Sequence, residues 1–412
     1  MGIAEDIENA NRKAFDIMNT GKAVLVDFDF ASKAIPGMKD NYVLHAGPPV
    51  RYEDMIESMK AAVQGALVFD GKADTIEKAD RLARSGDIVF RPCHEMSTVG
   101  PMAGITTAGM YVAVIENTAY RNRAYCNLHE GRGAILRFGA TGREVIDRLH
   151  WMNDVMGPTL RETIKKKPID LKSIAAEGVQ MGDELHQRFK ATSLLFLSAI
   201  TSNLLDQPHG QEVLRFIAER EQFFLNLSMP AMKALTDAAD GVKYSTLVTR
   251  MTRNGVQFGI QISGLKGKWF TGPAEIPKGL YFMGFSQEDA ARDFGDSAIM
   301  ETGGLGGLAS AGAPAVTRFV GGTVRDAMRF TEDGYRITQG TSRDFQIPGL
   351  DFRGTPLGID MIKVNETGIL PSINTGIAHR KAGIGQIGAG VSHPPIKAFN
   401  DALREFASVY GI

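Results

Sequence analysis

The chain has 412 residues, a formal net charge of -1, and 43% hydrophobic and 23% charged residues. This balance favours neither nucleic acid nor a membrane surface as a partner, and the longest apolar run, residues 194–200, is too short to span a bilayer. With two cysteines, the sequence excludes a disulfide framework and is typical of a cytoplasmic protein with two or three domains.

Residues 1–138 are predicted to form an N-terminal α/β domain. Strands are expected at residues 23–28, 65–69, 87–90 and 111–115, and helices at residues 52–62 and 75–83. Because strand and helix signals alternate at short spacing, the pattern indicates a largely parallel sheet.

Residues 139–240 are predicted to form an all-helical domain. Three helices are expected, at residues 141–156, 170–205 and 211–239. Thr141 and Glu144 match a capping box at the start of the first helix, and Pro158 should end it. Asp170 is placed to cap the second helix, and Pro230 must kink or split the third.

The polar segment 182–188 is predicted to lie on the second helix, which Gly182 could divide into two. On a helix, Asp183 would share a face with His186, and Glu184 with Arg188. A functional cluster and an ordinary solvated face both remain open interpretations.

Residues 241–412 are predicted to form a C-terminal α/β domain with glycine-rich anion-binding loops. Short strands such as residues 259–263 and a final helix at residues 396–409 are expected around five such loops. The loops cover residues 249–255, 301–307, 351–356, 374–379 and 383–388. Glycine lets backbone N–H groups converge on a ligand, and arginine adds a planar fork of donors. Five loops of this type indicate an anion site assembled from several segments.

Two familiar motifs are disfavoured by their context. Residues 383–388 have the letters of a dinucleotide fingerprint, but two prolines follow where a helix is required. Zinc binding by Cys93, His94, Cys126 and His129 is disfavoured because adjacent Cys and His side chains diverge in an extended stretch. Buried, unreactive thiols are the favoured interpretation, and we expect neither a metal nor a cofactor.

Several strings, taken in order, resemble the YlbE/AllG-like family over almost the whole chain from about residue 20. They lie at residues 99–104, 122–126, 181–184, 253–255, 301–307, 346–356 and 374–379. The resemblance implies a subunit of oxamate carbamoyltransferase, which converts oxalurate and phosphate into oxamate and carbamoyl phosphate during allantoin breakdown. It also implies an FdrA-like subunit and a third small subunit as partners, and we expect the isolated chain to form a homo-oligomer.

Carbamoyl transfer requires an anion cradle, a donor to the carbonyl oxygen and a proton-transfer group at the amide nitrogen. We predict His379 or His94 as the proton-transfer group and Glu301 as an orienting carboxylate; a purely structural His379 remains an alternative. The residues predicted to bind carbamoyl phosphate and oxamate or oxalurate are Arg253, Asn254, Gly303, Gly304, Gly306, Gly307, Arg353, Gly354, Thr355, Asn374 and Thr375. Arg253→Ala is expected to cost activity far more than stability.

Two other functions stay open. The chain could be an acyl-CoA or acyl-phosphate ligase-like subunit, which predicts CoA-dependent exchange and a phosphorylated histidine. It could also be a non-catalytic scaffold subunit, in which case substitutions of the loop arginines would matter little.

Overall fold

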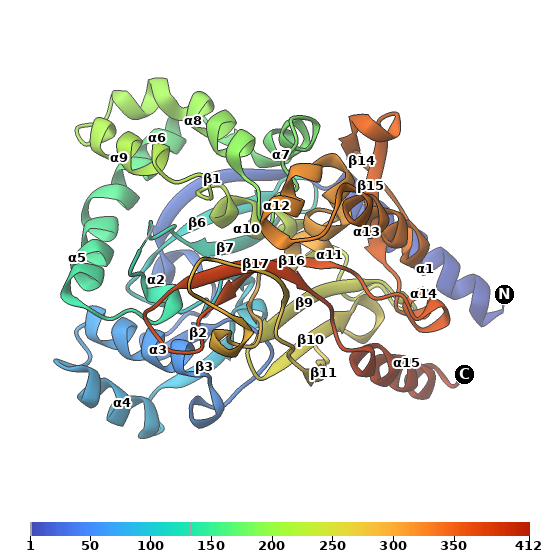
Figure 1. Ribbon diagram of the computed structural model, residues 1–412, viewed down its shortest axis with the longest axis horizontal. Coiled ribbons are helices and arrows are strands. Elements are labelled where there is room, and N and C mark those ends of the chain that lie inside the picture. The colour runs from blue at the N-terminus through green and yellow to red at the C-terminus, as the bar shows by residue number, and fades with distance from the viewer. Residues whose placement is uncertain (1, 132) are drawn as a thin grey trace.

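Figure 1 shows a computed structural model of the chain, which describes residues 2–131 and 133–412. Helices and several small sheets alternate along the chain, which confirms the predicted α/β multidomain class. The helices are α1 (Ile3–Thr20), α2 (Ala31–Ala34), α3 (Glu57–Phe69), α4 (Ile76–Arg84), α5 (Arg143–Trp151), α6 (Gly157–Lys166), α7 (Leu171–Gln180), α8 (Lys190–Leu205), α9 (Gly210–Ala218), α10 (Leu225–Asp237), α11 (Ile299–Thr302), α12 (Thr317–Val320), α13 (Val324–Ile337), α14 (Met361–Thr367) and α15 (Ile396–Tyr410). The strands are β1 (Ala23–Phe30), β2 (Tyr42–His45), β3 (Val89–Pro92), β4 (Thr98–Val99), β5 (Thr106–Thr107), β6 (Tyr111–Asn117), β7 (Asn122–Asn127), β8 (Ile169–Asp170), β9 (Val248–Asn254), β10 (Gln257–Ile262), β11 (Phe270–Pro273), β12 (Lys278–Tyr281), β13 (Phe294–Gly295), β14 (Thr338–Ile347), β15 (Arg353–Ile359), β16 (Ile373–Ala378) and β17 (Gln386–Ser392).

The N-terminal strands form mostly antiparallel sheets, so the prediction of a largely parallel sheet is wrong. The first sheet has the order β4-β7-β6-β1-β8, and only the short β4–β7 pair in it is parallel. A smaller sheet, β3-β2-β5, contains one parallel and one antiparallel pair. The alternation of strand and helix fails because residues 65–69 continue α3, and because β6 and β7 are joined directly as a hairpin.

The first predicted helix does not stop at Pro158. A π-helical turn, Met152–Met156, links α5 to α6, and Pro158 lies in the first turn of α6, where a missing N–H is tolerated. The capping box of Thr141 and Glu144 does not form, because Gly142 is the N-cap and no side chain caps the helix.

The second predicted helix is divided at Gly182, in agreement with the alternative of two shorter helices. Asp170 caps α7 by accepting a hydrogen bond from the Ser173 N–H, 3.0 Å away. Gly182 has φ +91°, and the segment up to Phe189 is a loop, so the placement of residues 182–188 on a helix is wrong. The third helix is interrupted between α9 and α10, whereas Pro230 lies inside α10.

Helix α10 is the central element of the molecule. Every residue from 225 to 236 is buried, and the helix contacts β6 and β7 of the first sheet as well as β9 and α11. A helix that is buried on every side belongs in a core, and this one joins the N-terminal sheet to the C-terminal strands. Helix α10 contacts strands beyond both predicted domain limits, at residues 138 and 240, and β8 pairs with β1 across the first limit. The division into three domains therefore stays a prediction.

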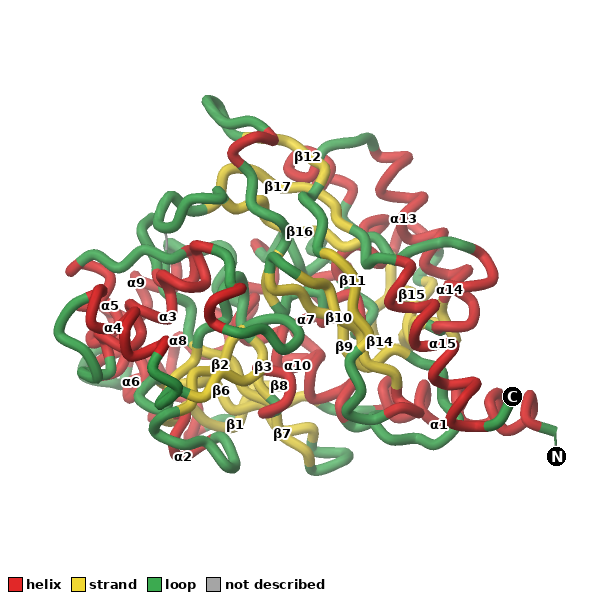
Figure 2. Tube along the Cα trace, turned by 90° about the horizontal axis from the view of Figure 1, so that it is seen from below, coloured by secondary structure: helices red, strands yellow, loops and turns green. Residues whose placement is uncertain are grey.

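The C-terminal strands form antiparallel sheets, and three of the five predicted anion loops are wrong as loops because they lie in these strands: residues 249–254 in β9, 353–356 in β15 and 374–378 in β16. Their orders are β11-β10-β9-β13, β12-β17-β16 and β14-β15. Figure 2 shows β12 and β17 toward the top of the view, β16 below them, and β9, β10 and β11 nearer the middle of the molecule. The predicted strand at residues 259–263 and the final helix are confirmed as β10 and α15. Among the described residues, no helix combines the length and apolarity that crossing a bilayer needs.

Candidate functional site

The glycine-rich loop 303–307 encloses a carboxylate of its own chain. The N–H of Gly307 donates to Glu301 Oε1, 2.9 Å away, and a Cβ at Gly306 would lie 2.1 Å from the same oxygen. Gly306 also has φ +57°, which favours glycine. One backbone N–H of the loop, that of Gly307, therefore holds Glu301, and the predicted binding of substrate by these glycines stays a prediction.

Gly303 and Gly304 serve the packing of this loop. A Cβ at Gly303 would lie 2.5 Å from the sulfur of Met232, and Gly304 adopts φ +87° beside Pro356. Neither glycine lines a cleft described below, so the structure gives both a structural role.

Glu301 in turn holds His186, a histidine of the polar segment 182–188 for which no role was predicted. The Nδ1 atom of His186 lies 2.7 Å from Glu301 Oε1, with both side chains buried. The carboxylate fixes the ring and favours the tautomer whose proton is on Nδ1. No hydrogen bond within the described chain engages Nε2, so this nitrogen is free for a substrate.

Glu184 and Asn374 complete the cluster around His186. The Glu184 carboxylate accepts hydrogen bonds from the backbone N–H of His186, at 3.0 Å, and from the side chain of Asn374, at 3.2 Å. The backbone N–H of Asn374 also donates to Glu301. Burial raises the pKa of Glu184 to about 7. Asn374 therefore contacts the two carboxylates and positions them, and its predicted contact with substrate stays a prediction.

His186 lines a small cavity of about 30 Å³ together with Arg137, Ser297 and Thr375. This cavity adjoins an open cleft of about 640 Å³, with which it shares several lining residues. The shared residues are Arg137, Phe138, Gln187, Gln222 and Gln386. The cavity and the open cleft together are called the His186 cleft below. Its outer part is lined by the cationic side chains of Arg188, Lys190 and Arg220.

Arg137 provides a buried cation at the deep end of the His186 cleft. It is 8% exposed, and its Nε and Nη1 atoms have no hydrogen-bond partner among the described residues. The nearest acid, Glu130, uses its oxygens on the backbone N–H groups of Leu136 and Arg137. Burial lowers the pKa of the guanidinium, because the charged form is desolvated. A buried guanidinium with unused donors is a strong binding group for a carboxylate or phosphate.

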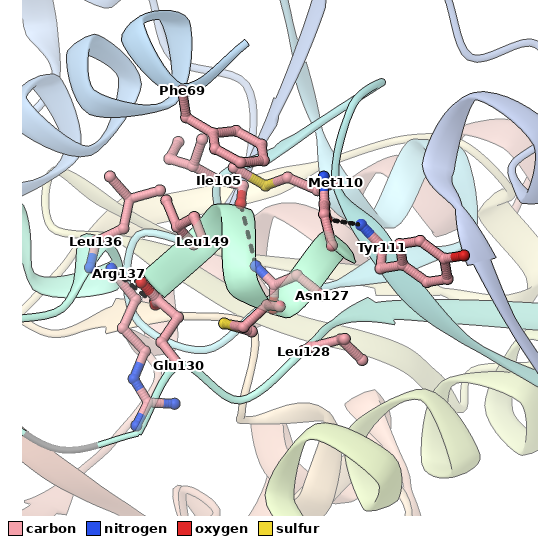
Figure 3. Close-up of a pocket in the computed structure, with 12 residues that line it drawn as sticks. Phe69, Ile105, Met110, Tyr111, Asn127, Leu128, Glu130, Leu136, Arg137 and Leu149 are labelled. Atoms are coloured by element: carbon pink, nitrogen blue, oxygen red, sulfur yellow. Dashed lines mark hydrogen bonds between the residues drawn. The ribbon is translucent and has the colours of Figure 1, made fainter. Parts of the chain in front are cut away.

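Figure 3 shows Glu130 and Arg137 beside a second cavity, formed mainly by hydrophobic side chains such as Phe69 and Leu149. The guanidinium of Arg137 points away from these hydrophobic groups. The second cavity measures about 30 Å³, enough for one or two water molecules, so we do not assign a substrate to it.

Arg253, the first predicted anion ligand, is completely buried and already paired. Its Nε donates to Asp293 at 2.8 Å, and the other nitrogens donate to the Gly295 carbonyl, to Ser297 and to Thr375. It therefore positions two hydroxyl groups of the His186 cleft and does not bind substrate itself. Thr375 reaches the cleft, as predicted.

Asn254 stabilises the turn after β9. It donates to the Pro48 carbonyl and accepts hydrogen bonds from the backbone N–H groups of Val256 and Gln257. Both ends of its amide are used by backbone groups, and its predicted contact with substrate stays a prediction.

The loop at residues 351–356 does not reach the His186 cleft. Arg353 is exposed, and its guanidinium stacks on the ring of Tyr335 at 3.5 Å. Gly354 lies against the backbone of Ser342, and Thr355 is buried with its hydroxyl unpaired in the described structure. The sheet pairing of β14 with β15 places these residues in a separate hairpin.

The two predicted histidines also lie elsewhere. His379 Nδ1 accepts a hydrogen bond from the Lys381 N–H, and its Nε2 lies 3.9 Å from Asp289. Neither ring nitrogen of His94 has a hydrogen-bond partner in the described chain; the nearest carboxylate atom, on Asp296, is 3.5 Å from Nε2. Burial lowers the pKa of His94 well below its ordinary value.

Cys93 and Cys126 are buried, as predicted, and burial raises the pKa of both thiols. Across residues 2–131 and 133–412, no three His, Cys, Asp or Glu side chains are grouped so that they could hold a metal ion. Residues 383–388 lead directly into β17, which leaves no place for the helix of a dinucleotide fold.

The sequence therefore indicated the segments that form the site more accurately than the side chains that act in it. His186 and Glu184 lie in the polar segment 182–188, which was singled out without a role. Arg137 was missed, although it follows Gly131 and Gly133 and so has the same glycine–arginine character as the C-terminal loops.

Comparisons with known proteins agree over almost the full length. A family model described as oxamate carbamoyltransferase subunit AllG matches residues 88–297. The uncharacterized protein YahG of Escherichia coli K12 is 46% identical over 415 residues, which cover 100% of this chain and 88% of that protein. Oxamate carbamoyltransferase subunit AllG of the same strain is 44% identical over 414 residues, covering 98% and 99%. A crystal structure of a conserved protein of unknown function from Enterococcus faecalis V583 has a TM-score of 0.97 and 46% identity, with 99% of each chain covered.

Proposed function

The chain belongs to the AllG family, and on that premise we propose that it is a subunit of a carbamoyltransferase acting on oxalurate and oxamate. In the reaction, an oxygen of hydrogen phosphate attacks the carbamoyl carbon of oxalurate, and the bond from that carbon to the oxamate nitrogen breaks. Hydrogen phosphate loses one proton and the oxamate nitrogen gains one, which gives carbamoyl phosphate and oxamate. The printed name of the Escherichia coli relative and the chemistry of the His186 cleft support this assignment.

The observation that carries the proposal is the pairing of His186 with Glu301 at a cavity that also contains Arg137. With its Nδ1 proton held by Glu301, His186 presents a basic Nε2 that can take the phosphate proton and deliver it to the leaving nitrogen. Glu301 stabilises the imidazolium formed between these two steps. His186 thus takes the role that we had predicted for His94 or His379.

Binding of the anions is assigned to Arg137 and to the Ser297 hydroxyl that Arg253 positions. The unused N–H groups of Arg137 suit the planar carboxylate of oxamate or a phosphate. Ser297, which accepts a hydrogen bond from Arg253, lies where its hydroxyl can donate to the carbonyl oxygen as it gains negative charge, whereas the Thr375 hydroxyl donates to Asp293 at 3.0 Å. This assignment needs no metal, cofactor or covalent intermediate.

We extend the proposal to a cytoplasmic, multi-subunit enzyme with an FdrA-like subunit and a third small subunit. The relative is itself named a subunit, and the outer part of the His186 cleft is open. Experiment can distinguish the two alternatives. The ligase-like alternative predicts a reaction that depends on CoA, and the scaffold alternative predicts that substitution of Arg137 has no effect on activity.

The test is a carbamoyl-transfer assay on the chain co-expressed with its partner subunits, measuring oxalurate formed from carbamoyl phosphate and oxamate. Arg137→Gln should raise the KM of one anion by about 10- to 150-fold, the loss expected for hydrogen bonds to a charged group. Arg215→Gln, which removes an exposed arginine of α9, is the matched control.

Calorimetric titration of the isolated chain with carbamoyl phosphate separates the alternatives. Saturable binding that is lost in Arg137→Gln places the anion site in this chain, and binding only after the partners are added indicates a shared site. The proposal fails if the complete complex transfers no carbamoyl group, or if Arg137→Gln leaves its kinetics unchanged.

A further inference from the structure

A second open cleft, of about 800 Å³, lies between the first sheet and the sheet that contains β9 and β10. It brings together two segments that the proposed function does not use, residues 91–97 and 121–125. From the C-terminal part come Arg250, Gln261 and Lys266. Its volume falls in the range typical of sites for small molecules and cofactors. This space is called the His94 cleft below.

Most charges in the His94 cleft are neutralised within the protein. Arg250 pairs with Asp237 and Asp240 at 3.0 Å, and the buried amine of Lys233 also donates to Asp237. Two cations and two carboxylates therefore balance. Arg91 pairs with Glu95, and Arg123 with Glu116.

Two cations at the rim of the His94 cleft form no ion pair in the described chain. Arg121 and Lys266 are exposed, and neither forms a side-chain hydrogen bond there; burial raises the pKa of Asp240, and the nearby charge of Lys266 opposes that rise. The two cations come from different parts of the chain, the β6–β7 turn and the segment after β10. Among the described residues, the rim therefore carries a net positive charge.

The wall of the same cleft contains His94, a polar side chain with no partner. It is 1% exposed, and both ring nitrogens lack a hydrogen bond among the described residues. Buried polar groups are nearly always satisfied, so an orphan imidazole lining an open cleft indicates a missing ligand. Trp269 packs edge-on against this ring at 6.2 Å, and its Nε1 donates to Glu95.

We propose that the His94 cleft is a second binding site, for a small organic phosphate with two or more negative charges. Arg121 and Lys266 would contact the phosphate oxygens, and His94 would lie in the wall of the cleft beside the ligand. The site is separate from the His186 cleft, because the two share no lining residue. It therefore does not depend on the proposed carbamoyl transfer.

The experiment is calorimetric titration of the full chain with inorganic pyrophosphate and with fructose 1,6-bisphosphate as probes. We expect saturable binding whose affinity falls about tenfold or more in Arg121→Ala/Lys266→Ala, because charge-assisted hydrogen bonds are lost. Lys167→Ala/Arg215→Ala removes the same charge from exposed positions outside both clefts and should leave the affinity unchanged.

Two further variants place the bound probe. Arg137→Gln should not alter the affinity, since it acts in the His186 cleft, and Trp269→Phe should abolish any change in tryptophan fluorescence during the titration. The proposal is overturned if neither probe binds saturably, or if binding survives Arg121→Ala/Lys266→Ala and is lost in Arg137→Gln.

Discussion

His186 and His94 are both buried beside a carboxylate, yet their surroundings differ in one decisive respect. His186 is 3% exposed and hydrogen-bonded to Glu301 at 2.7 Å, whereas His94 is 1% exposed and lies 3.5 Å from Asp296 without a hydrogen bond. The first ring has a fixed orientation and one free nitrogen, while the second is held by packing alone. Burial near an acid is therefore not sufficient for proton transfer; the acid must also orient the ring.

The largest effect is expected for His186→Gln, which keeps a hydrogen bond to Glu301 but removes the base. The kcat for carbamoyl transfer should fall by about 10²–10⁴-fold, the usual contribution of a general acid or base. His94→Gln is the matched variant and should leave kcat close to that of the wild type. Equal losses in the two variants, measured in the same assay, would remove the distinction between the two histidines.

The next effect concerns stability. Arg253→Met leaves Asp293 buried without its cation, although Thr375 and Ser392 still donate to it, so the free energy of unfolding should fall by about 3–5 kcal/mol in urea denaturation. This reverses the expectation from sequence that Arg253 matters for activity more than for the fold. Arg123→Met, which breaks an exposed pair with Glu116, should cost about 1 kcal/mol or less. Comparable losses would show that the Arg253 pair is not effectively buried.

A smaller effect depends on pH. Since burial lowers the pKa of His94, the unfolded chain binds this proton more readily, so the contribution of His94 to the free energy of unfolding should be constant above about pH 6.5 and fall below it. One such group contributes a slope of about 1.4 kcal/mol per pH unit. His94→Gln should remove the contribution of one proton to this pH slope, and urea unfolding between pH 7 and 5 measures the change. The contribution of His45, whose pKa burial lowers to about 4, should remain. An unchanged slope would mean that His94 can be charged without unfolding.

The smallest effect is expected for Arg353→Ala. The exposed guanidinium stacks on Tyr335, so its removal should cost about 0.5–1 kcal/mol of stability and leave carbamoyl transfer unaffected. If the kcat/KM of the variant were reduced by about tenfold or more, a direct role in binding would have to be reconsidered.

Local signals predicted local structure well. The β-branched run that begins at Ala23 forms β1, Asp170 caps α7, and the amphipathic C-terminal segment forms α15. The apolar run at residues 65–69 was wrongly assigned to a strand, because short apolar runs do not distinguish a strand from a buried helix. Its Ala66 and Leu67 are completely buried on α3, so tertiary packing decided the outcome.

The candidate site was less predictable, because it depends on contacts between distant segments. Glu184, Glu301 and Asn374 are separated by more than 70 residues at each step, and no local pattern indicates that they meet. The segment 182–188 was read on a helical wheel, but its backbone is a loop that buries residues which a helix would have exposed. The density of glycines indicated that residues 303–307 contact an anion. It did not reveal that this anion is Glu301, a side chain of the protein itself.

That internal anion has a consequence for how the loop responds to its surroundings. Because Glu301 is tethered a few residues away from Gly307, its effective concentration at the cradle far exceeds that of any dissolved phosphate. Free anions cannot displace it, so the loop should keep its shape whatever the phosphate or salt concentration of the cell. The wall of the His186 cleft is therefore ordered before a ligand enters. The entropic cost of ordering it arises during folding and does not recur in each catalytic cycle.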